Sequence, residues 1–430
     1  MATITGTGAR EIPITDSSKS SSDWYRWIIL FVCYFALATT YMGRLGLGPM
    51  GTFIRADLSI TRAQFGFFIT AISFGFGLSV FVAGWLADRL GIRKVLTFAQ
   101  VIVGVCLISI LFAKTYTGCL VIMFLSGISM GLIQPGLMKA LIIWFPLKER
   151  ATAMGIVTLA VNFGGLITAS TLPALATVYG WRAGFLAMGI FAIVFGIIFC
   201  FLYRSHSSEK GNRVLPAASG EDLTSKSATN RSDMLSLLKS REHWLLTIAA
   251  SLLAVIEFSV LNFFVIYLKE HILLPVVTAG FMLGVLDAAG ICGKFFTGLI
   301  SDRIFGGKRK QTFIALSIAA TVVCAAIAFF TKSTPQWLIF ACSAILGLAA
   351  FGWTGLFFTM IGEQTGKEHI GVVNGAAMGI TVFAYACGVP IFGYLADKTH
   401  GWGWSWTYVV GIGVISTLCL FFVREERRKI

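Results

Sequence analysis

The chain has 430 residues, of which 57% are hydrophobic and 13% charged, and its formal net charge is +14. Apolar runs of about 18 residues or more recur along the whole chain, and each is long enough to cross a hydrocarbon core of roughly 30 Å. The composition excludes a water-soluble domain, and the placement of most basic residues in short loops argues for membrane topology rather than nucleic-acid binding.

The apolar runs predict twelve membrane-spanning helices and therefore an all-α membrane protein. An open strand would leave its backbone donors and acceptors unpaired in lipid, so each run is expected to be helical. The expected spans are 26–54, 63–85, 95–113, 117–145, 152–178, 183–203, 243–268, 277–300, 312–331, 336–362, 370–396 and 404–423.

Polar segments divide the spans into two halves. Residues 1–25 are serine-rich and lack the apolar centre of a signal peptide, so we expect a disordered tail. Residues 204–242 are rich in serine, glycine and charge, which is typical of a linker. The sequence thus predicts a six-helix bundle over 26–203, a second over 243–423, and a basic tail over 424–430.

Lysine and arginine predict the orientation. With the N-terminus placed inside, 24 of them fall in the inner loops and tails and 7 in the outer loops. Basic loops are retained in the cytoplasm. We therefore expect an integral protein of the plasma (inner) membrane with both termini cytoplasmic.

A loop motif occurs in both halves. Gly84 to Lys94 reads GWLADRLGIRK, and the GLISDR that begins at Gly298 repeats its first part 214 residues later. The repetition indicates a duplicated six-helix unit with any central site between the halves. A third match, from Gly393 to Asp397, falls at the outer end of a span and is interpreted as a helix end and not as a gate.

The motif after the second span and its shorter copy resemble the signature of the major facilitator superfamily. Finer features are similar to the organophosphate antiporters and anion:cation symporters. These are Tyr41 to Arg44, Pro135 with Lys139, Trp144 to Arg150, Asn162 to Gly165, and Tyr267 to Glu270. The resemblance implies two bundles, expected as a monomer, that alternate access to a site between them. It also implies that the loop charges close a cytoplasmic gate, formed by Asp88, Arg89, Arg93, Asp302 and Arg303.

Three positions depart from those branches. Glu257 aligns with an arginine of the glycerol-3-phosphate antiporters, and Val161 aligns with their fifth-helix histidine. Gly43 replaces an aspartate that many anion:cation symporters carry before the first-helix arginine. These differences argue against phosphate-ester exchange and against the usual proton site of the symporters.

Five ionisable residues lie well inside the expected spans: Arg44, Lys139, Glu257, Asp287 and Lys294. Each costs several kcal/mol at the bilayer centre if it faces lipid, so each should face water, a partner charge or a substrate. Shifted by the repeat offset, Arg44 falls within one residue of Glu257. The planar guanidinium suits a carboxylate or a phosphate.

Glu257 has more than one interpretation. It could carry a proton or bind the ammonium group of a zwitterion, and a plain Arg44–Glu257 bridge that latches the halves is the alternative without a ligand. Asp287 is a second candidate for proton coupling. Lys294 corresponds to an arginine in related carboxylate carriers, yet structural pairing explains Asp287 and Lys294 equally well. Lys139 is also consistent with a side chain that extends toward the helix end.

Polar and aromatic residues within the spans complete the expected substrate site. Alongside Arg44, Lys139, Glu257 and Lys294, these are Tyr41, Gln134, Asn162, Asn262, Trp353 and Tyr385. Binding pockets combine apolar walls with a few placed polar groups, although packing explains any one of these residues as well.

Several activities have no support in the sequence. No GxxxxGK[ST], GxSxG or HExxH motif occurs, so neither an enzyme nor an ATPase is expected. The nine cysteines all lie in apolar segments without a CxxC or a cysteine–histidine cluster, so we expect neither metal nor cofactor. The sequence predicts a secondary transporter that carries a small organic anion, most simply a carboxylate, together with protons. An amino-acid carrier and a non-transporting sensor of the same fold are the alternatives.

Overall fold

The computed structural model describes residues 19–203, 240–303, 309–365 and 370–423, which form helices and contain no strand. The helices are α1 (Lys19–Leu45), α2 (Leu47–Leu58), α3 (Arg62–Leu90), α4 (Ile92–Ser109), α5 (Tyr116–Trp144), α6 (Leu147–Tyr179), α7 (Trp181–Leu202), α10 (Arg241–Glu270), α11 (Val276–Arg303), α12 (Arg309–Ala328), α13 (Gln336–Phe351), α14 (Trp353–Thr365), α15 (Ile370–Lys398) and α16 (Gly403–Phe422).

Within the described residues, twelve stretches are long and apolar enough to cross a membrane, which confirms the predicted all-α class. The first crosses as α1 and α2, and the tenth as α13 and α14. Helix α1 begins at Lys19, earlier than the expected start at residue 26. The expected linker over 204–242 and the tail over 424–430 lie almost wholly outside the described residues.

Helix breaks interrupt the first and the tenth spans near their middles. One falls at Gly46, between α1 and α2, and the other at Gly352, between α13 and α14. The apolar runs are continuous across both breaks, so the hydropathy pattern did not predict them. Arg44 lies just before the first break and Trp353 just after the second, which places both beside an irregular backbone of the kind that forms binding sites in transporters.

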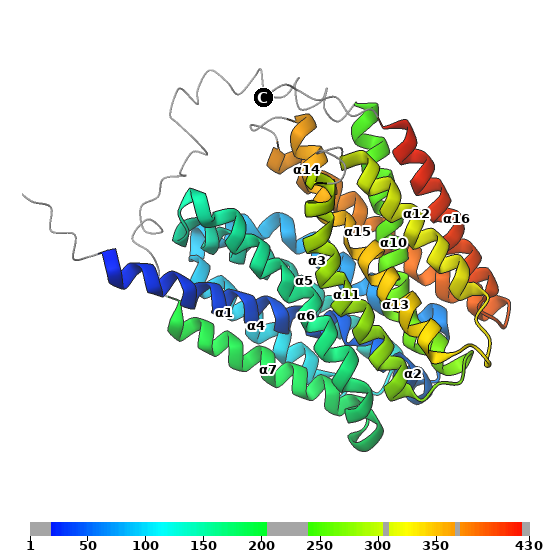
Figure 1. The fold of residues 1–430 in the computed structure, drawn as a ribbon. Coiled ribbons are helices and arrows are strands. Elements are labelled where there is room, and N and C mark those ends of the chain that lie inside the picture. Colours follow the sequence, from blue (N-terminus) through cyan, green and yellow to red (C-terminus); the bar gives the residue numbers. More distant parts are fainter. Residues whose placement is uncertain (1–18, 204–239, 304–308, 366–369, 424–430) are drawn as a thin grey trace, which may run out of the picture.

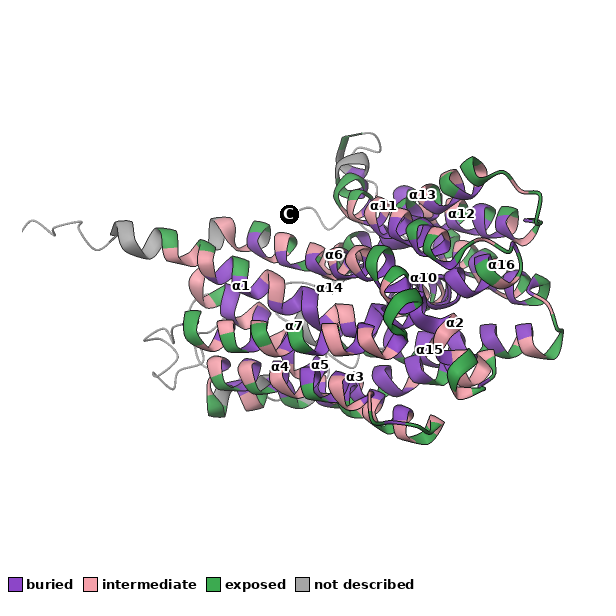
Figure 2. Ribbon diagram, turned by 90° about the horizontal axis from the view of Figure 1, so that it is seen from below, coloured by how far each residue is buried: buried purple, intermediate pink, exposed green. Residues whose placement is uncertain are grey.

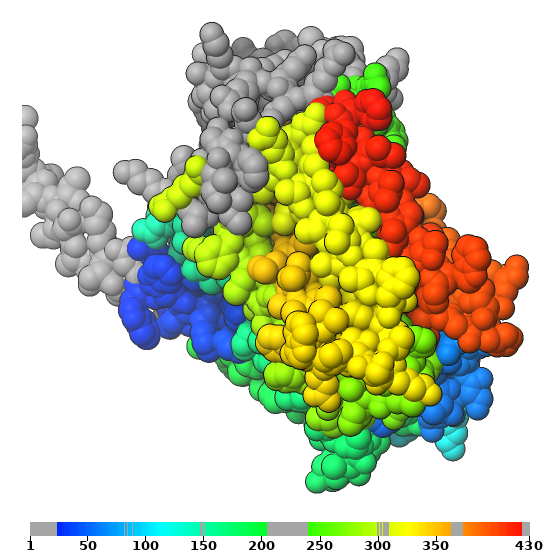
Figure 3. Space-filling model, turned by 45° about the vertical axis from the view of Figure 1, so that its right-hand side comes forward, coloured from blue at the N-terminus to red at the C-terminus, as the bar shows by residue number. Residues whose placement is uncertain are grey.

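The helices form two groups along the chain. Helices α1 to α7 pack mainly on one another, and α10 to α16 do the same. Figure 1 shows the two groups inclined to each other, and Figure 3 shows the later helices, coloured yellow to red, forming one continuous face. Buried residues lie mostly where helices face one another, and exposed ones mostly outside (Figure 2).

Large apolar side chains also cover the outer surface. Phe329 is 84% exposed, Phe112 is 80% exposed and Phe201 is 76% exposed. In water such a surface would cause aggregation. Its presence over both groups of helices is typical of a fold that spans a membrane.

Three helix pairs make the main contacts between the groups: α3 with α15, α6 with α11, and α2 with α10. We call the side with the ends of α2, α10 and α15 the far side, and the opposite one the linker side. Two of the pairs approach closely on the far side, because a Cβ on Gly48 would lie 2.1 Å from the Leu261 carbonyl oxygen and one on Gly66 would lie 2.7 Å from Pro390 Cα. The far side is therefore closed.

Candidate substrate site

Arg44 is buried where the two groups meet. Only 6% of it is exposed, and its Nη2 donates to the Tyr385 hydroxyl of α15 and, at 3.4 Å, to Ser73 Oγ of α3. Its Nε is buried and has no hydrogen-bond partner among the described residues. A buried guanidinium with an unused donor favours an anion as its further partner.

Aromatic rings surround this guanidinium. Its Cζ lies 4.9 Å from the ring centroid of Phe258, 5.3 Å from Tyr385, 5.5 Å from Phe76 and 6.0 Å from Tyr41. Phe258 and Tyr385 also stack on each other at 4.0 Å. Cation–π contacts hold the charge without neutralising it, so Arg44 keeps its full attraction for an anion.

Glu257 precedes Phe258 on α10 and is 8% exposed. It accepts a hydrogen bond from Trp353 Nε1 at 2.9 Å. Within the described chain it forms no ion pair with Arg44, so the latch that the sequence left open is not made in this structure. Arg44 and Glu257 both lie at the site, as expected, but each one bonds to another side chain: Arg44 to Tyr385, and Glu257 to Trp353.

Lys294 and Asp287 form a second polar group on α11. Lys294 Nζ donates to Asn162 Oδ1 of α6 at 2.5 Å and lies 5.8 Å from the ring centroid of Phe351. Asp287 is 1% exposed, and its carboxyl group packs on Gly165 of α6. Both side chains therefore cross from the second group of helices to the first.

The remaining expected site residues differ in how many of their polar groups are already hydrogen-bonded and in how exposed they are. The Tyr41 hydroxyl donates to Gln134 Oε1 at 3.0 Å, and both side chains are partly exposed. Asn262 donates back to the Phe258 carbonyl oxygen of its own helix at 2.8 Å, which uses one of its donors. Lys139 is partly exposed on α5, five residues beyond Gln134.

The expected cytoplasmic gate falls largely outside the described side chains. Nothing is described of the Asp88 and Asp302 side chains. Arg89 is exposed, with its Cζ 4.4 Å from the ring centroid of Trp85, and Arg303 is exposed as well. Arg93 lines a surface hollow on the linker side. The gate therefore stays a prediction.

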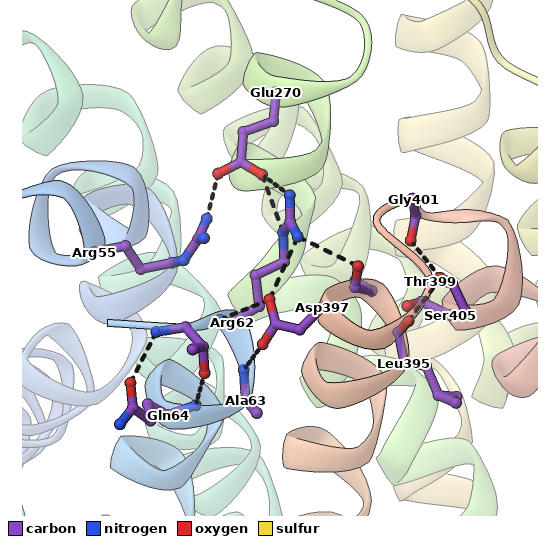
Figure 4. A network of polar contacts seen from close by, with 12 residues as sticks. Arg55, Arg62, Ala63, Gln64, Glu270, Leu395, Asp397, Thr399, Gly401 and Ser405 are labelled. Carbon is purple, nitrogen blue, oxygen red and sulfur yellow. Dashed lines mark hydrogen bonds and ion pairs between the residues drawn. The ribbon is translucent and has the colours of Figure 1, made fainter. Parts of the chain in front are cut away.

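A network of ion pairs that the sequence did not predict closes the far side. Arg55 and Arg62 both bind Glu270, and Arg62 Nη1 also lies 3.4 Å from Asp397 Oδ1 (Figure 4). The arginines belong to α2 and α3, and the acids to α10 and α15, so every pair joins the two groups. The sequence shows opposite charges at span ends on the same side, but it does not say which of them pair.

The Asp397 position corrects one interpretation. Asp397 does lie near the end of α15, as expected, but it also accepts hydrogen bonds from the backbone amides of Arg62 at 3.1 Å and Ala63 at 2.8 Å. The third copy of the motif is thus a contact between the groups as well as a helix end.

Comparison with known proteins identifies the family. The sequence profile described as Major Facilitator Superfamily matches residues 30–382. The chain belongs to the Major Facilitator Superfamily. Superfamily members that resemble it include the Escherichia coli membrane sensor protein UhpC, 26% identical over 94% of this chain and 93% of that protein. The Haemophilus influenzae glycerol-3-phosphate transporter is also 26% identical, over 94% of this chain and 92% of its own.

A relative named for an organic anion is the probable sulfoacetate transporter SauU of Cupriavidus necator, 24% identical over 91% of this chain and 93% of its own. These relatives fit the organophosphate antiporter and anion:cation symporter branches. The chain is therefore an integral membrane transporter and not an enzyme, as the sequence predicted.

Solved superfamily structures share the fold. The inward-facing, unoccupied bacterial homologue of the human lysosomal transporter Spinster has a TM-score of 0.75 at 16% identity, over 93% of this chain and 97% of that one. A D-xylose–proton symporter has a TM-score of 0.74 at 15% identity, over 93% and 98% of the two chains.

Proposed function

We propose that this transporter carries a small organic anion, most simply a monocarboxylate, with protons by alternating access. Arg44 binds the anion. The observation that carries the proposal is the Arg44 guanidinium, buried between the two bundles, surrounded by aromatic rings and with its Nε unused among the described residues.

The charges at the site favour a single negative charge on the substrate. Apart from the partly exposed Lys139 on α5, Arg44 and Lys294 supply two positive groups, and Glu257 and Asp287 supply two acids. A phosphate ester or dianion would meet two carboxylates without a surplus of cations, at a cost in low dielectric. A monoanion that enters with a proton leaves the balance unchanged, and Glu257 and Asp287 are the two groups that can take the proton.

We further propose that transport is inward and that this structure is inward-facing. If the basic linker side is cytoplasmic, the closed far side makes this structure inward-facing, and Arg55, Arg62, Glu270 and Asp397 form the outer gate. Uptake then begins when those pairs separate.

Uptake by proteoliposomes tests the proposal. Purified protein should accumulate a radiolabelled monocarboxylate when the outside is made acidic, and a protonophore should abolish the accumulation. A melting-temperature screen of monocarboxylates, dicarboxylates, sugar phosphates and amino acids identifies the class, because a ligand that binds the folded form stabilises it. Stabilisation by amino acids alone would favour the zwitterion carrier and contradict the anion.

The similarity to UhpC, which is named as a membrane sensor, favours one other candidate function. A sensor would bind an anion at Arg44 without moving it. Thermal stabilisation by a ligand that never enters the vesicles would support the sensor and overturn transport.

A further inference from the structure

The face of α11 toward α6 consists of small residues with one carboxylate among them. A Cβ on Gly280 would lie 2.6 Å from the Ala169 carbonyl oxygen, and one on Gly284 would lie 2.8 Å from Ser170 Oγ. Asp287 follows one turn later on the same face. The two bundles therefore pack closely at the point where Asp287 meets α6.

Gly165 forms the seat of the Asp287 carboxyl group. A Cβ on Gly165 would lie 2.7 Å from Asp287 Oδ1 and 2.8 Å from both Cγ and Oδ2, so any larger residue would displace the carboxyl group. Asp287 is 1% exposed, and its Oδ1 is buried without a hydrogen-bond partner in the described part of the chain. The seat provides space for the group but no donor.

The charged groups around Asp287 are engaged with other partners. Lys294 lies two turns further along α11, and Glu257 lies on α10, which packs on α11. Lys294, however, donates to Asn162, and Glu257 accepts from Trp353. Neither Lys294 nor Glu257 makes an ion pair with Asp287 across the described residues.

Among the described side chains, α6 and α13 add no further charge at this level. Helix α6 contributes Asn162, Thr168 and Ser170, which are neutral, and Thr168 donates to the Gly165 carbonyl oxygen at 2.9 Å. Helix α13, which also packs on α11, contains no charged residue, and Cys342 is its one titratable group.

We infer that Asp287 is a proton-binding site whose occupancy permits the far side to close. An ionised carboxylate without a partner costs several kcal/mol in a water-excluded interface, and the neutral acid costs much less. The neutral acid therefore fits on Gly165, and the carboxylate favours separation of α6 and α11. For one proton, the ratio of closed to open forms changes by up to about tenfold per pH unit.

This inference rests on the proposed proton-coupled transport and deepens it by naming the residue through which the proton acts on bundle movement. In the open form Asp287 faces far-side water and takes a proton from it. Closure then carries the proton into the interface. Release on the linker side restores the carboxylate, with Lys294 as the nearest cation.

Distances between spin labels measure closure without any substrate. One label is placed at Lys114→Cys in the α4–α5 loop and the other at Lys332→Cys in the α12–α13 loop, two exposed far-side positions in different bundles. The native cysteines that are exposed or half-exposed are first changed to alanine: Cys200, Cys292, Cys387 and Cys419. The full chain in nanodiscs is then measured from about pH 5 to about pH 9, the range in which a buried acid titrates.

In the otherwise unchanged chain, the short distance of the closed form should lose population as the pH rises. Asp287→Asn should keep the short distance at every pH, and Glu257→Gln should keep the pH response. A distance distribution that does not change with pH, or an Asp287→Asn variant that responds like the parent, overturns the inference.

Substitutions at two glycines of α6 test the contact between Gly165 and Asp287 independently of ionisation. Gly165→Ala should reduce the closed population at all pH values, and adding Asp287→Ala should restore it by making room for the methyl group. Gly155→Ala is the matched control, because a Cβ at Gly155 on the same helix meets nothing within 4 Å. If the double variant does not restore closure, the Asp287 carboxyl group does not need the space at Gly165, and the inference is contradicted.

The same data distinguish the inference from the proposed function. If the protein transports an anion with protons but Asp287→Asn retains the pH response, the inference fails and the proposed function stands. If no solute is transported but Asp287→Asn abolishes the response, the inference about closure stands and the proposed function fails.

Discussion

Asp397 caps the start of α3 from the other bundle. Its carboxylate accepts hydrogen bonds from the backbone amides of Arg62 at 3.1 Å and Ala63 at 2.8 Å, and it also forms an ion pair with the Arg62 side chain. Caps normally come from the residue just before a helix, which here is Thr61. Because the cap at Asp397 spans the bundle interface, it exists only while the far side is closed.

Removing this cap should open the far side. Loss of a capping side chain costs about 0.5–2 kcal/mol, so Asp397→Ala should increase the open population by roughly 2- to 30-fold. A cysteine at Ile266 reports opening, because Ile266 is fully buried against Gly51 of the other bundle. Its labelling rate by a membrane-impermeant maleimide should rise by the same factor.

Asp57→Ala is the matched control for the cap. Asp57 binds Arg182 at 2.5 Å on the same side of the protein, but both residues belong to the first bundle. It should leave the Ile266→Cys labelling rate unchanged. Equal labelling of the Asp397→Ala variant and its parent would mean that the cap does not hold the far side closed.

Glu257→Gln should separate exchange from accumulation. A glutamine keeps the size and the acceptor for Trp353 but cannot carry a proton between the two sides. Counterflow of labelled substrate should therefore persist, whereas accumulation driven by a pH gradient should fall, because Asp287 alone then carries a proton. Glu149→Gln, at a half-exposed surface pair with Arg26, is the control and should match the parent in both measurements. Accumulation by Glu257→Gln that equals the parent's removes Glu257 from proton coupling.

Trp353 should act through Glu257. Trp353→Phe keeps a ring and removes the Nε1 donor, a hydrogen bond to a charged group worth about 1.5–3 kcal/mol. Gradient-driven uptake should fall, and the Trp353→Phe/Glu257→Gln double variant should be no worse than Glu257→Gln alone, since both changes break one interaction. Additive losses in that cycle would show that Trp353 has a separate role.

The twelve spans were predictable because lipid leaves the backbone few alternatives. Each apolar run had to be a helix, and the part of the chain that the structure describes contains twelve helical stretches of that length. The burial of Arg44 and Glu257 followed from the same reasoning, since charge within a span has to be shielded from lipid. Their partners did not follow: Trp353 was expected only as one of several aromatic and polar residues within the spans, and its bond to Glu257 comes just after the break at Gly352.

The far-side network was not predicted for a different reason. Arg55, Arg62 and Glu270 lie at span ends, where charges are expected to face water and headgroups, so nothing in a single sequence pairs them. Their pairing depends on how the two bundles lean together. The contact between Asp287 and Gly165 could not be predicted for a similar reason, because it follows from packing between helices that are distant in sequence.

The central claim is that Arg44 binds the transported anion, and uptake by proteoliposomes containing an Arg44 variant tests it most directly. Removing one partner of a buried charge pair costs about 2–5 kcal/mol, so Arg44→Ala should reduce kcat/KM for uptake by at least about 30-fold. The kcat/KM of Arg44→Lys should lie between those of the parent and Arg44→Ala. Arg182→Ala, on the far side, should match the parent. Uptake by Arg44→Ala at the parent rate would contradict the account.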